Sequence, residues 1–278
     1  MPAVFLADRA FLRLSGPDSR SFLNNIITAD VESVPQGCAG VAALLTPQGK
    51  ILFEFLLYPQ GDDVLLEVSS AESNALLRRL TMYKLRAAVT ITVEDIQGVT
   101  VSWNDATPDG SAEDLRFKAA GQTLWRKPGH HGSDALAAYT DLRILNGIAE
   151  AGQDYALQDA FPHDVLLDLN GGVSFKKGCY VGQEVVSRMQ HRKTARRRVV
   201  IVTATAALSG ASAELRADDR PLGTLGTVNG THGLAIARID RIGEALAKGS
   251  SITIGDEAVS VRMPDWTGIE FPTTAEES

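Results

Sequence analysis

The chain has few cysteines and lacks long apolar stretches. Cys38 and Cys179 are its two cysteines, and neither has the neighbours of a metal-ligand motif. Unpaired cysteines are typical of a reducing compartment. No run of about 18 apolar residues occurs, so no membrane-spanning helix is predicted. The first residues carry neither a basic region nor a long apolar stretch, so we expect no secretory signal and a cytoplasmic protein.

Motifs of several common enzyme classes are also missing. Neither Gly-x-x-x-x-Gly-Lys-Ser/Thr nor Gly-x-Gly-x-x-Gly occurs, so nucleotide-driven chemistry is unsupported. His130-His131 and His163 offer nitrogen ligands, but no third ligand lies near them in the sequence, so no metal site is predicted. The net charge of −7 gives no general attraction to nucleic acid or anionic membranes, so a site for a polyanion must be a local patch.

The composition is that of a folded protein. Hydrophobic residues make up 44% of the 278 positions and charged residues 22%, which excludes the disordered and fibrous classes. This length predicts two domains, or one large divided domain.

The first two-thirds of the chain mix helix and strand patterns. Two runs of strand-forming residues, 41–45 and 51–58, flank a Pro-Gln-Gly turn and predict a hairpin. Asp18 predicts the start of one helix, and Ser69 with Glu72 predicts a capping box at the start of a second. Further elements are expected as strands at 64–68, 88–94 and 97–103, a polar loop at 105–114 and a helix at 134–146.

The pattern changes after Arg198, where short strand-like runs follow one another. The runs are 199–205, 213–216, 223–228, 233–239 and 251–261, and Asp-Asp, Asn-Gly and Gly-Asp pairs provide hairpin-turn signals. Their spacing predicts a small β-barrel. The predicted fold class is therefore α+β, with an α+β domain over residues 1–195 and a C-terminal β-barrel domain over residues 196–278. Residues 273–278 are expected to fray.

The segment Lys177–Glu184 carries the strongest chemical pattern, and we call it the signature segment. Gly178 and Gly182 bracket a turn around Cys179, and a helical pattern starts at Gly182 or the next residue. A thiol beside lysines and near a helix N-terminus has a lowered pKa, which predicts a reactive cysteine. The residues alone also fit a tight turn around a buried, unreactive cysteine.

The helix that follows opens a locally basic stretch. Glu184 and Arg188 lie one turn apart and can pair. A cluster then extends through Arg188, His191, Arg192, Lys193, Arg196, Arg197 and Arg198. Such a cluster can hold the carboxylates of a small ligand or the phosphates of RNA, and it also fits a solvated linker between domains.

The signature segment, Lys-Gly-Cys-Tyr-Val-Gly-Gln-Glu, resembles the signature of the YgfZ-type folate-binding proteins, which are relatives of the glycine-cleavage T-protein. Weaker similarities follow in family order along nearly the whole chain. They cover residues 16–23, 28–31, 43–50, 83–86, 142–147, 161–162, 170–175, 223–226 and 233–235.

This resemblance implies a T-protein-like fold, in which two α/β subdomains and a β-barrel surround a central pocket. It implies a tetrahydrofolate-binding protein that assists assembly or repair of iron–sulfur proteins, with related factors in mitochondria. The expected partners are folate and iron–sulfur client or scaffold proteins, and a monomer is expected. Cys179 would act at the mouth of the pocket, as a thiolate on a cluster, a partner or a one-carbon adduct.

A pterin needs flat walls and a polar edge, and a carboxylate can accept a pair of its N–H bonds. Trp103 and Trp125 are further candidate walls, although each aromatic residue alone also fits core packing. With the resemblance, the residues assigned to folate are Tyr83, Lys84, Arg143, Asp164, Tyr180, Gln183, Glu184 and Arg188.

Some positions depart from the family pattern. T-proteins carry an acidic pair used in aminomethyl transfer, where this chain has Phe53 and Glu54. Leu166 and Lys193 stand where many relatives have Asn and Gly. Two alternatives stay open: a folate-dependent aminomethyl transferase that uses Glu54, and a folate-linked tRNA-modification factor that uses the basic cluster.

Overall fold

The body of the protein is built on a nine-stranded sheet with the strand order β1-β7-β9-β8-β3-β4-β5-β2-β6. The computed structural model describes residues 2–103, 107–132, 136–208, 210 and 212–272. Strands β3 and β8 pair in parallel. The strands are β1 (Ala3–Leu6), β2 (Arg9–Ser15), β3 (Cys38–Leu45), β4 (Ile51–Gln60), β5 (Asp63–Ser69), β6 (Thr90–Val93), β7 (Val99–Trp103), β8 (Ala112–Asp114) and β9 (Leu124–Pro128).

Alternating side chains bury both faces of this sheet, as the period of a strand requires. In β4, Phe55 and Leu57 pack in the core beneath α1 and α2, whereas Leu56 and Tyr58 pack in the core that includes residues of α3 and α4. The helices are α1 (Ser19–Asn24), α2 (Ser70–Lys84), α3 (Leu115–Ala119), α4 (Leu136–Asn146), α5 (Gln183–Arg192) and α6 (Ile239–Ala247), with 3₁₀ turns η1 (Val31–Ser33) and η2 (Asp265–Thr267).

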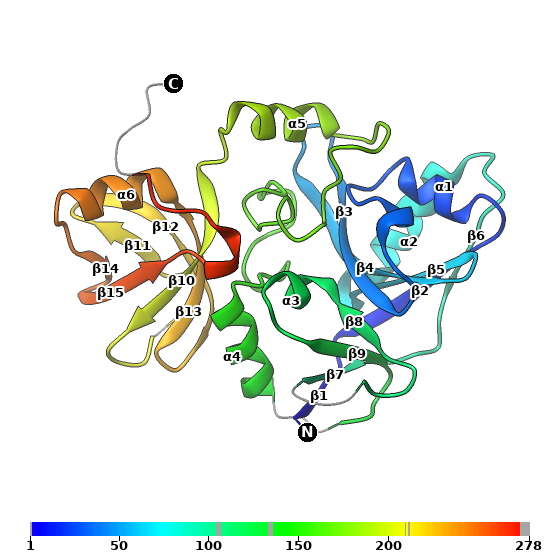
Figure 1. Cartoon of the computed structure of the whole chain (residues 1–278), viewed down its shortest axis with the longest axis horizontal. Coiled ribbons are helices and arrows are strands. Elements are labelled where there is room, and N and C mark those ends of the chain that lie inside the picture. The colour runs from blue at the N-terminus through cyan, green and yellow to red at the C-terminus, as the bar shows by residue number, and fades with distance from the viewer. Residues whose placement is uncertain (1, 104–106, 133–135, 209, 211, 273–278) are drawn as a thin grey trace.

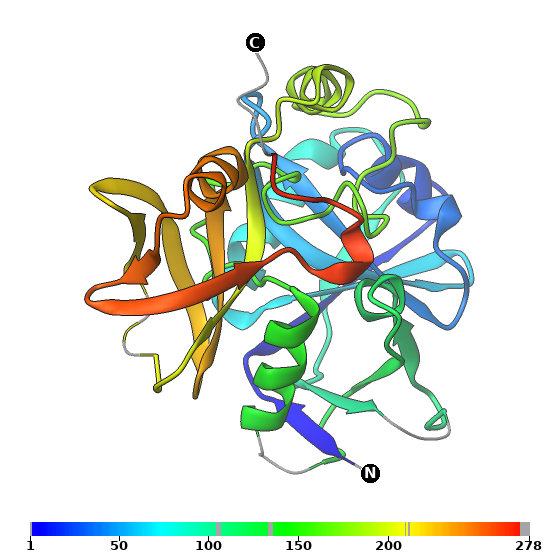
Figure 2. The ribbon, with the colours of Figure 1, turned by 60° about the vertical axis from the view of Figure 1, so that its left-hand side comes forward.

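The C-terminal strands close into a barrel in the order β10-β13-β12-β11-β14-β15. Val200 and Val202 point into its interior, whereas Val199 and Ile201 pack outward against the main core of the body. Helix α4 stands between barrel and body (Figure 1, Figure 2). The strands are β10 (Arg197–Ala204), β11 (Glu214–Ala217), β12 (Arg220–Asn229), β13 (His232–Arg238), β14 (Ile252–Ile254) and β15 (Glu257–Arg262). The predicted α+β class with a C-terminal barrel is confirmed.

Residues 147–182, between α4 and α5, contain no helix and no named strand. Irregular stretches of this length inside a compact protein are usually functional. This one is ordered by turns, among them the bond from the Gly152 amide to the Tyr155 carbonyl (2.8 Å). It therefore acts as a shaped connection that brings several side chains to fixed places.

Two predicted helix caps are wrong in detail. Asp18 precedes α1, but its carboxylate accepts a hydrogen bond from the Ala88 amide (2.8 Å) and does not cap the helix. Ser69 precedes α2, but its side chain makes no capping bond and, with Glu72, lines a cavity. In both cases the place of the side chain in the tertiary structure replaces the expected capping hydrogen bond within the helix.

Strand β8 and helix α6 are among the elements that were not predicted. Strand β8 lies within the expected polar loop, because pairing with β3 and β9 stabilises a short polar segment. Helix α6 follows β13 directly and packs its Ile242 side into the barrel core. The predicted helix at 134–146 is α4, and its first two positions, like residues 273–278, lie outside the described residues. None of the described helices is long and apolar enough to cross a membrane.

A buried ionic network crosses the centre of the body. Glu67 accepts hydrogen bonds from Arg9 Nε (2.8 Å), from Arg126 Nε (3.0 Å) and from the Tyr58 hydroxyl. Burial opposes ionisation of Glu67, but the charges of Arg126 and Arg9 outweigh it and lower its pKa to about 2. The network continues through Asp114, whose Oδ2 accepts from Arg126 Nη1 (3.3 Å).

Asp114 also binds the side chain that completes the network. Its carboxylate accepts from Arg116 Nη2 (2.8 Å) and Nε (3.1 Å). The network therefore joins β2 and β5 to β8, α3 and β9, two groups of elements that are far apart in the sequence.

We predict that Glu67→Gln costs about 3–5 kcal/mol of unfolding free energy, because it leaves buried guanidinium charge without its partner. The carboxyl of Glu67 titrates near 4.5 when unfolded and near 2 when folded. Its contribution to stability should therefore be complete above about pH 4.5 and be lost as the pH falls toward 2. Urea unfolding across this pH range measures both effects.

Glu32→Gln is the matched control for this prediction. Glu32 pairs with Arg20 (2.9 Å) at the surface, where its side chain is 64% exposed. Such a pair is worth less than about 1 kcal/mol. Equal losses in the two variants, or an unchanged acid profile in Glu67→Gln, would contradict the central role of the network.

Candidate functional site

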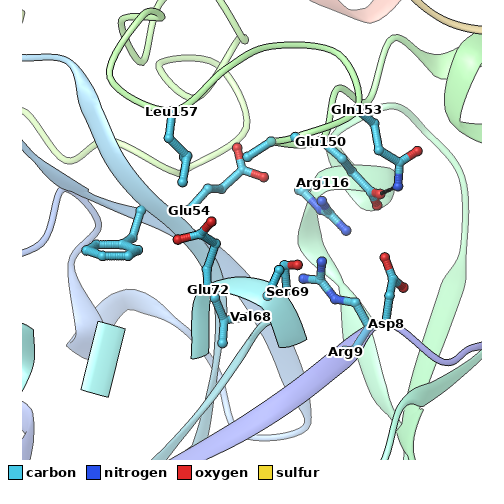
Figure 3. Close-up of a pocket in the computed structure, with 14 residues that line it drawn as sticks. Asp8, Arg9, Glu54, Val68, Ser69, Glu72, Arg116, Glu150, Gln153 and Leu157 are labelled. Carbon is cyan, nitrogen blue, oxygen red and sulfur yellow. Dashed lines mark hydrogen bonds between the residues drawn. The ribbon is translucent and has the colours of Figure 1, made fainter. Parts of the chain in front are cut away.

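A cavity of about 370 Å³ lies beside the ionic network, and we call it the Glu54 cavity. Five separate stretches of chain form it, from the start of β2, from β4, from the start of α2, from α3 and from the irregular segment (Figure 3). Its lining residues are Asp8, Arg9, Phe53, Glu54, Val68, Ser69, Ala71, Glu72, Arg116, Glu150, Ala151, Gly152, Gln153 and Leu157. This volume is in the range of small-molecule sites.

Glu54 is a carboxyl in the wall of the cavity. It projects from β4, and the Tyr155 hydroxyl donates a hydrogen bond to its Oε2. Burial raises the pKa of Glu54, although this hydrogen bond and the charge of Arg116 act in the opposite direction. A carboxyl with a raised pKa inside a cavity is typical of a functional group.

Glu150 behaves in the opposite way. Burial disfavours its charge, but Arg143, Arg9 and Arg116 outweigh burial and lower the pKa of Glu150 to about 2. The Tyr139 hydroxyl also donates to Glu150 Oε1 (2.8 Å). The cavity therefore combines a carboxylate that neighbouring arginines keep ionised with one whose pKa is raised by burial.

The signature segment lies at a different place, and three contacts hold it there. The Lys177 ammonium donates to the carbonyls of Asn24 (2.5 Å), Ile27 (2.6 Å) and Ala29 (2.8 Å), after α1. Burial lowers the pKa of Lys177 to about 8. Upstream, the Thr28 hydroxyl donates to the Gly172 carbonyl (2.6 Å) and the Ser174 amide to the Thr28 carbonyl (2.9 Å).

Gly182 fixes the other end of the signature segment. It adopts φ +81°, and a Cβ there would lie 2.5 Å from the Thr46 carbonyl oxygen and 3.1 Å from the Gly49 Cα. Only glycine allows this approach to the hairpin turn between β3 and β4. Helix α5 starts directly after it, as predicted.

Cys179 is exposed between these anchors. The alternative of a buried cysteine is therefore wrong, while the reactivity of Cys179 stays a prediction. The sulfur lies on a fixed turn four residues before α5, and Cys179 is not among the described residues that line the Glu54 cavity. The thiol and the cavity are two distinct places on the molecule.

The structure scatters the eight residues assigned to folate from the sequence. Tyr83 and Lys84 end α2, while Gln183, Glu184 and Arg188 lie on α5. None of the eight appears among the described residues that line the Glu54 cavity, which leaves their binding role a prediction. The remaining three, Arg143, Asp164 and Tyr180, are buried.

These buried side chains have different surroundings. Arg143 lines an adjoining cavity of about 220 Å³ that shares Arg9 and Glu150 with the Glu54 cavity. Asp164 accepts a hydrogen bond from the Phe161 amide (3.0 Å). The Tyr180 hydroxyl is buried without a hydrogen-bond partner among the described residues, and burial raises its pKa to about 12.

Only part of the basic cluster is exposed and free of the acidic partners described below. Arg198 is buried and binds Asp168 through both terminal nitrogens (2.6 and 3.0 Å), and Arg197 pairs with Asp159 (3.2 Å). The predicted pair of Glu184 and Arg188 is confirmed at 2.5 Å. The exposed remainder comprises His191, Arg192, Lys193 and Arg196. Binding of tRNA stays a prediction.

Sequence reasoning missed most of the cavity. It singled out Glu54 and gave no role to Arg9, Arg116 or Glu150. One signal was present: Glu67 interrupts the apolar run 64–68 of β5, and Arg126 directly follows Leu124 and Trp125 in β9. Buried charges need partners, so these positions indicate an internal ionic network.

Comparison with known proteins first defines the fold. The chain is similar to the glycine cleavage system aminomethyltransferase T from Bartonella henselae, with a TM-score of 0.71 over 95% of this chain and 86% of that one, at 14% identity. Residues 196–269 match the family described as CAF17, C-terminal beta-barrel domain. The protein therefore has a T-protein-like aminomethyltransferase fold, mixed α/β with a closed six-stranded C-terminal barrel.

Curated relatives are named iron–sulfur cluster assembly factor IBA57, mitochondrial, or its homologs. The homolog from Coccidioides immitis is 33% identical over 72% of this chain and 56% of its own length, and that from Chaetomium globosum is 30% identical over 70% and 54%. Human IBA57 is 27% identical over 95% of this chain and 85% of its own. This chain thus spans little more than half the length of the fungal relatives.

These names support part of what the resemblance implied. The expected kinship with mitochondrial iron–sulfur assembly factors is confirmed. The narrower resemblance to YgfZ-type proteins stays a prediction. The relatives are named as mitochondrial, in contrast to the cytoplasmic expectation, so the location of this chain also stays a prediction.

We predict that Gly182→Ala costs about 2–4 kcal/mol, because it combines a left-handed backbone with a clash against the Thr46 carbonyl. Thermal and urea unfolding measure the loss. Gly178→Ala is the control, since a Cβ at Gly178 meets nothing within 4 Å and its φ is not positive. Equal effects of the two substitutions would mean that Gly182 does not anchor the signature segment.

Proposed function

We propose that this protein binds tetrahydrofolate in the Glu54 cavity and assists the assembly or repair of iron–sulfur proteins. The fold and the names of the relatives support the proposal. The observation that carries it is the cavity itself, in which a carboxyl of raised pKa faces a fixed ionic wall.

The chemistry of the cavity suits a reduced pterin. Glu54 and Glu150 can accept N–H bonds from the 2-amino-pyrimidinone edge. Phe53, Val68 and Leu157 offer apolar contact for flat rings. Arg9 can attract a carboxylate of the glutamate tail. The proposal thus places the ligand away from the residues that the sequence had assigned.

Cys179 would serve a different step from folate binding. It is exposed on a fixed turn, close in sequence to Phe175, which is 37% exposed, and to the exposed Lys176. An exposed thiol with exposed cationic and aromatic residues nearby in the sequence is suited to contact with an iron–sulfur client or scaffold protein. Because Cys179 lies outside the cavity lining, loss of its sulfur should leave folate binding unchanged.

A folate-dependent aminomethyl transferase is the second candidate, and the raised pKa of Glu54 favours it. A carboxyl with a raised pKa holds a proton more readily and can act as a general acid or base. Formation of methylenetetrahydrofolate from an aminomethyl donor, abolished by Glu54→Gln, would make transfer the function.

We predict that tetrahydrofolate binds the purified protein and that Glu54→Gln weakens binding about tenfold or more. The substitution replaces one of the two carboxyl acceptors, Glu54 and Glu150, by a neutral amide. Calorimetric titration under anaerobic conditions measures both affinities. Glu184→Gln is the control: Glu184 is 84% exposed on α5 and was assigned to folate from the sequence. If Glu184→Gln weakened binding and Glu54→Gln did not, the ligand would lie at the signature segment.

We predict that Cys179→Ala folds and binds tetrahydrofolate like the natural protein but no longer supports iron–sulfur enzymes in cells. An exposed side chain contributes at most about 0.5 kcal/mol to stability, so folding should be unaffected. Activities of iron–sulfur enzymes in a strain that lacks the natural gene are the readout. Cys38→Ala, in β3, is the control and should keep full support. Full support by Cys179→Ala would remove the thiol from the proposed function.

A further inference from the structure

A bulge in barrel strand β12 reaches across to the wall of the Glu54 cavity. The pairing of β12 with β13 shifts register between Leu225 and Val228, where β12 carries one extra residue. Gly226 and Thr227 lie in this bulge. A β-bulge redirects backbone and side chains out of the ladder, and here they face the turn Glu150–Asp154 of the body.

Gly226 permits a close approach of the two domains. A Cβ at this position would lie 2.8 Å from the Asp154 Cα and 2.8 Å from its Oδ1. Real side chains do not tolerate such distances, so glycine is required for the barrel to sit directly on the turn.

Thr227 makes two hydrogen bonds here, one to the turn and one to Arg143 on α4. Its amide donates to Asp154 Oδ1 (2.9 Å), and its hydroxyl oxygen accepts from Arg143 Nη2 (2.9 Å). Asp154 Oδ2 accepts in turn from Arg143 Nη1 (2.8 Å) and from the Glu150 amide (2.8 Å). One barrel residue therefore closes a ring of hydrogen bonds around the turn.

Arg143 connects this ring to the cavity wall. Its Nη2 also donates to the Gln153 side chain (3.1 Å), and its Nη1 to the Ile148 carbonyl (2.7 Å). Its Nε lies 3.8 Å from Glu150 Oε2. Arg143 is 1% exposed and its donors are engaged with protein groups, so its contacts assign it to holding Glu150 and Gln153, both of which line the Glu54 cavity.

We propose that Thr227 is a positioning residue of the Glu54 cavity, through which the barrel sets the orientation of Glu150 and Gln153 by way of Arg143 and Asp154. The barrel then contributes to the binding site by holding residues of its wall in place. The ligand in question is the reduced folate of the proposed function, on which this inference rests. The positioning itself can be tested without any ligand.

Thr227→Val removes the side-chain hydroxyl but keeps the shape of the side chain and the backbone amide. It should weaken tetrahydrofolate binding about tenfold, since Arg143 loses an acceptor and the turn loses its fixed place. Thr227→Ser should restore the affinity. Asn229→Ala is the matched control, because Asn229 joins the same strand to Asp141 on α4 (2.6 Å) without touching the turn, and it should bind within about twofold of the natural protein.

Hydrogen exchange of the apo proteins gives a second readout. The amides of residues 152–154 should exchange at least about threefold faster in Thr227→Val than in the natural protein or in Asn229→Ala. Unchanged exchange overturns the inference. The inference is also overturned if Thr227→Val binds tetrahydrofolate within twofold of the natural protein, or if Asn229→Ala loses as much affinity as Thr227→Val. If the natural protein binds no tetrahydrofolate, the proposed function fails, and the exchange measurement still decides whether Thr227 positions the turn.

Discussion

Three guanidinium groups and two carboxylates, buried together in the body, form the interaction on which the rest of the structure depends. Arg9, Arg116 and Arg126 are joined by Glu67 and Asp114. Buried charges are stable only when they are paired, so the strands that carry them must meet in one arrangement. The network leaves one positive charge in excess. Together with Arg143, which lies outside the network, Arg9 and Arg116 keep the nearby Glu150 ionised despite burial.

The same excess charge shapes the candidate site. Arg9 and Arg116 contribute to the network and also line the Glu54 cavity, so the cavity has a rigid ionic wall. Glu54 accepts a hydrogen bond from the Tyr155 hydroxyl, and burial raises its pKa. The cavity thus contains an ionised carboxylate, Glu150, and a carboxyl of raised pKa, Glu54. Such a pair of carboxyl groups is suited to ligand recognition and proton transfer.

The irregular segment between α4 and α5 serves both candidate sites. Near its start, Glu150 and Gln153 line the cavity, and near its end Cys179 is exposed on an anchored turn. The barrel contacts the first of these regions through Thr227, and the hairpin turn between β3 and β4 contacts the second through Gly182. The proposed function, which joins folate binding to a surface thiol, would therefore use residues that the whole fold holds in place, including its C-terminal barrel.

The sequence by itself determined the fold class, the barrel, the start of α5 and the exceptional signature around Cys179, because periodicity, turn residues and a long motif are local properties. It did not determine which charged residues meet. Arg9, Glu54, Arg116 and Glu150 come from distant parts of the chain, and only strand pairing and burial bring them to one cavity. Burial also decided their protonation, since a pKa depends on neighbours that the sequence alone does not place.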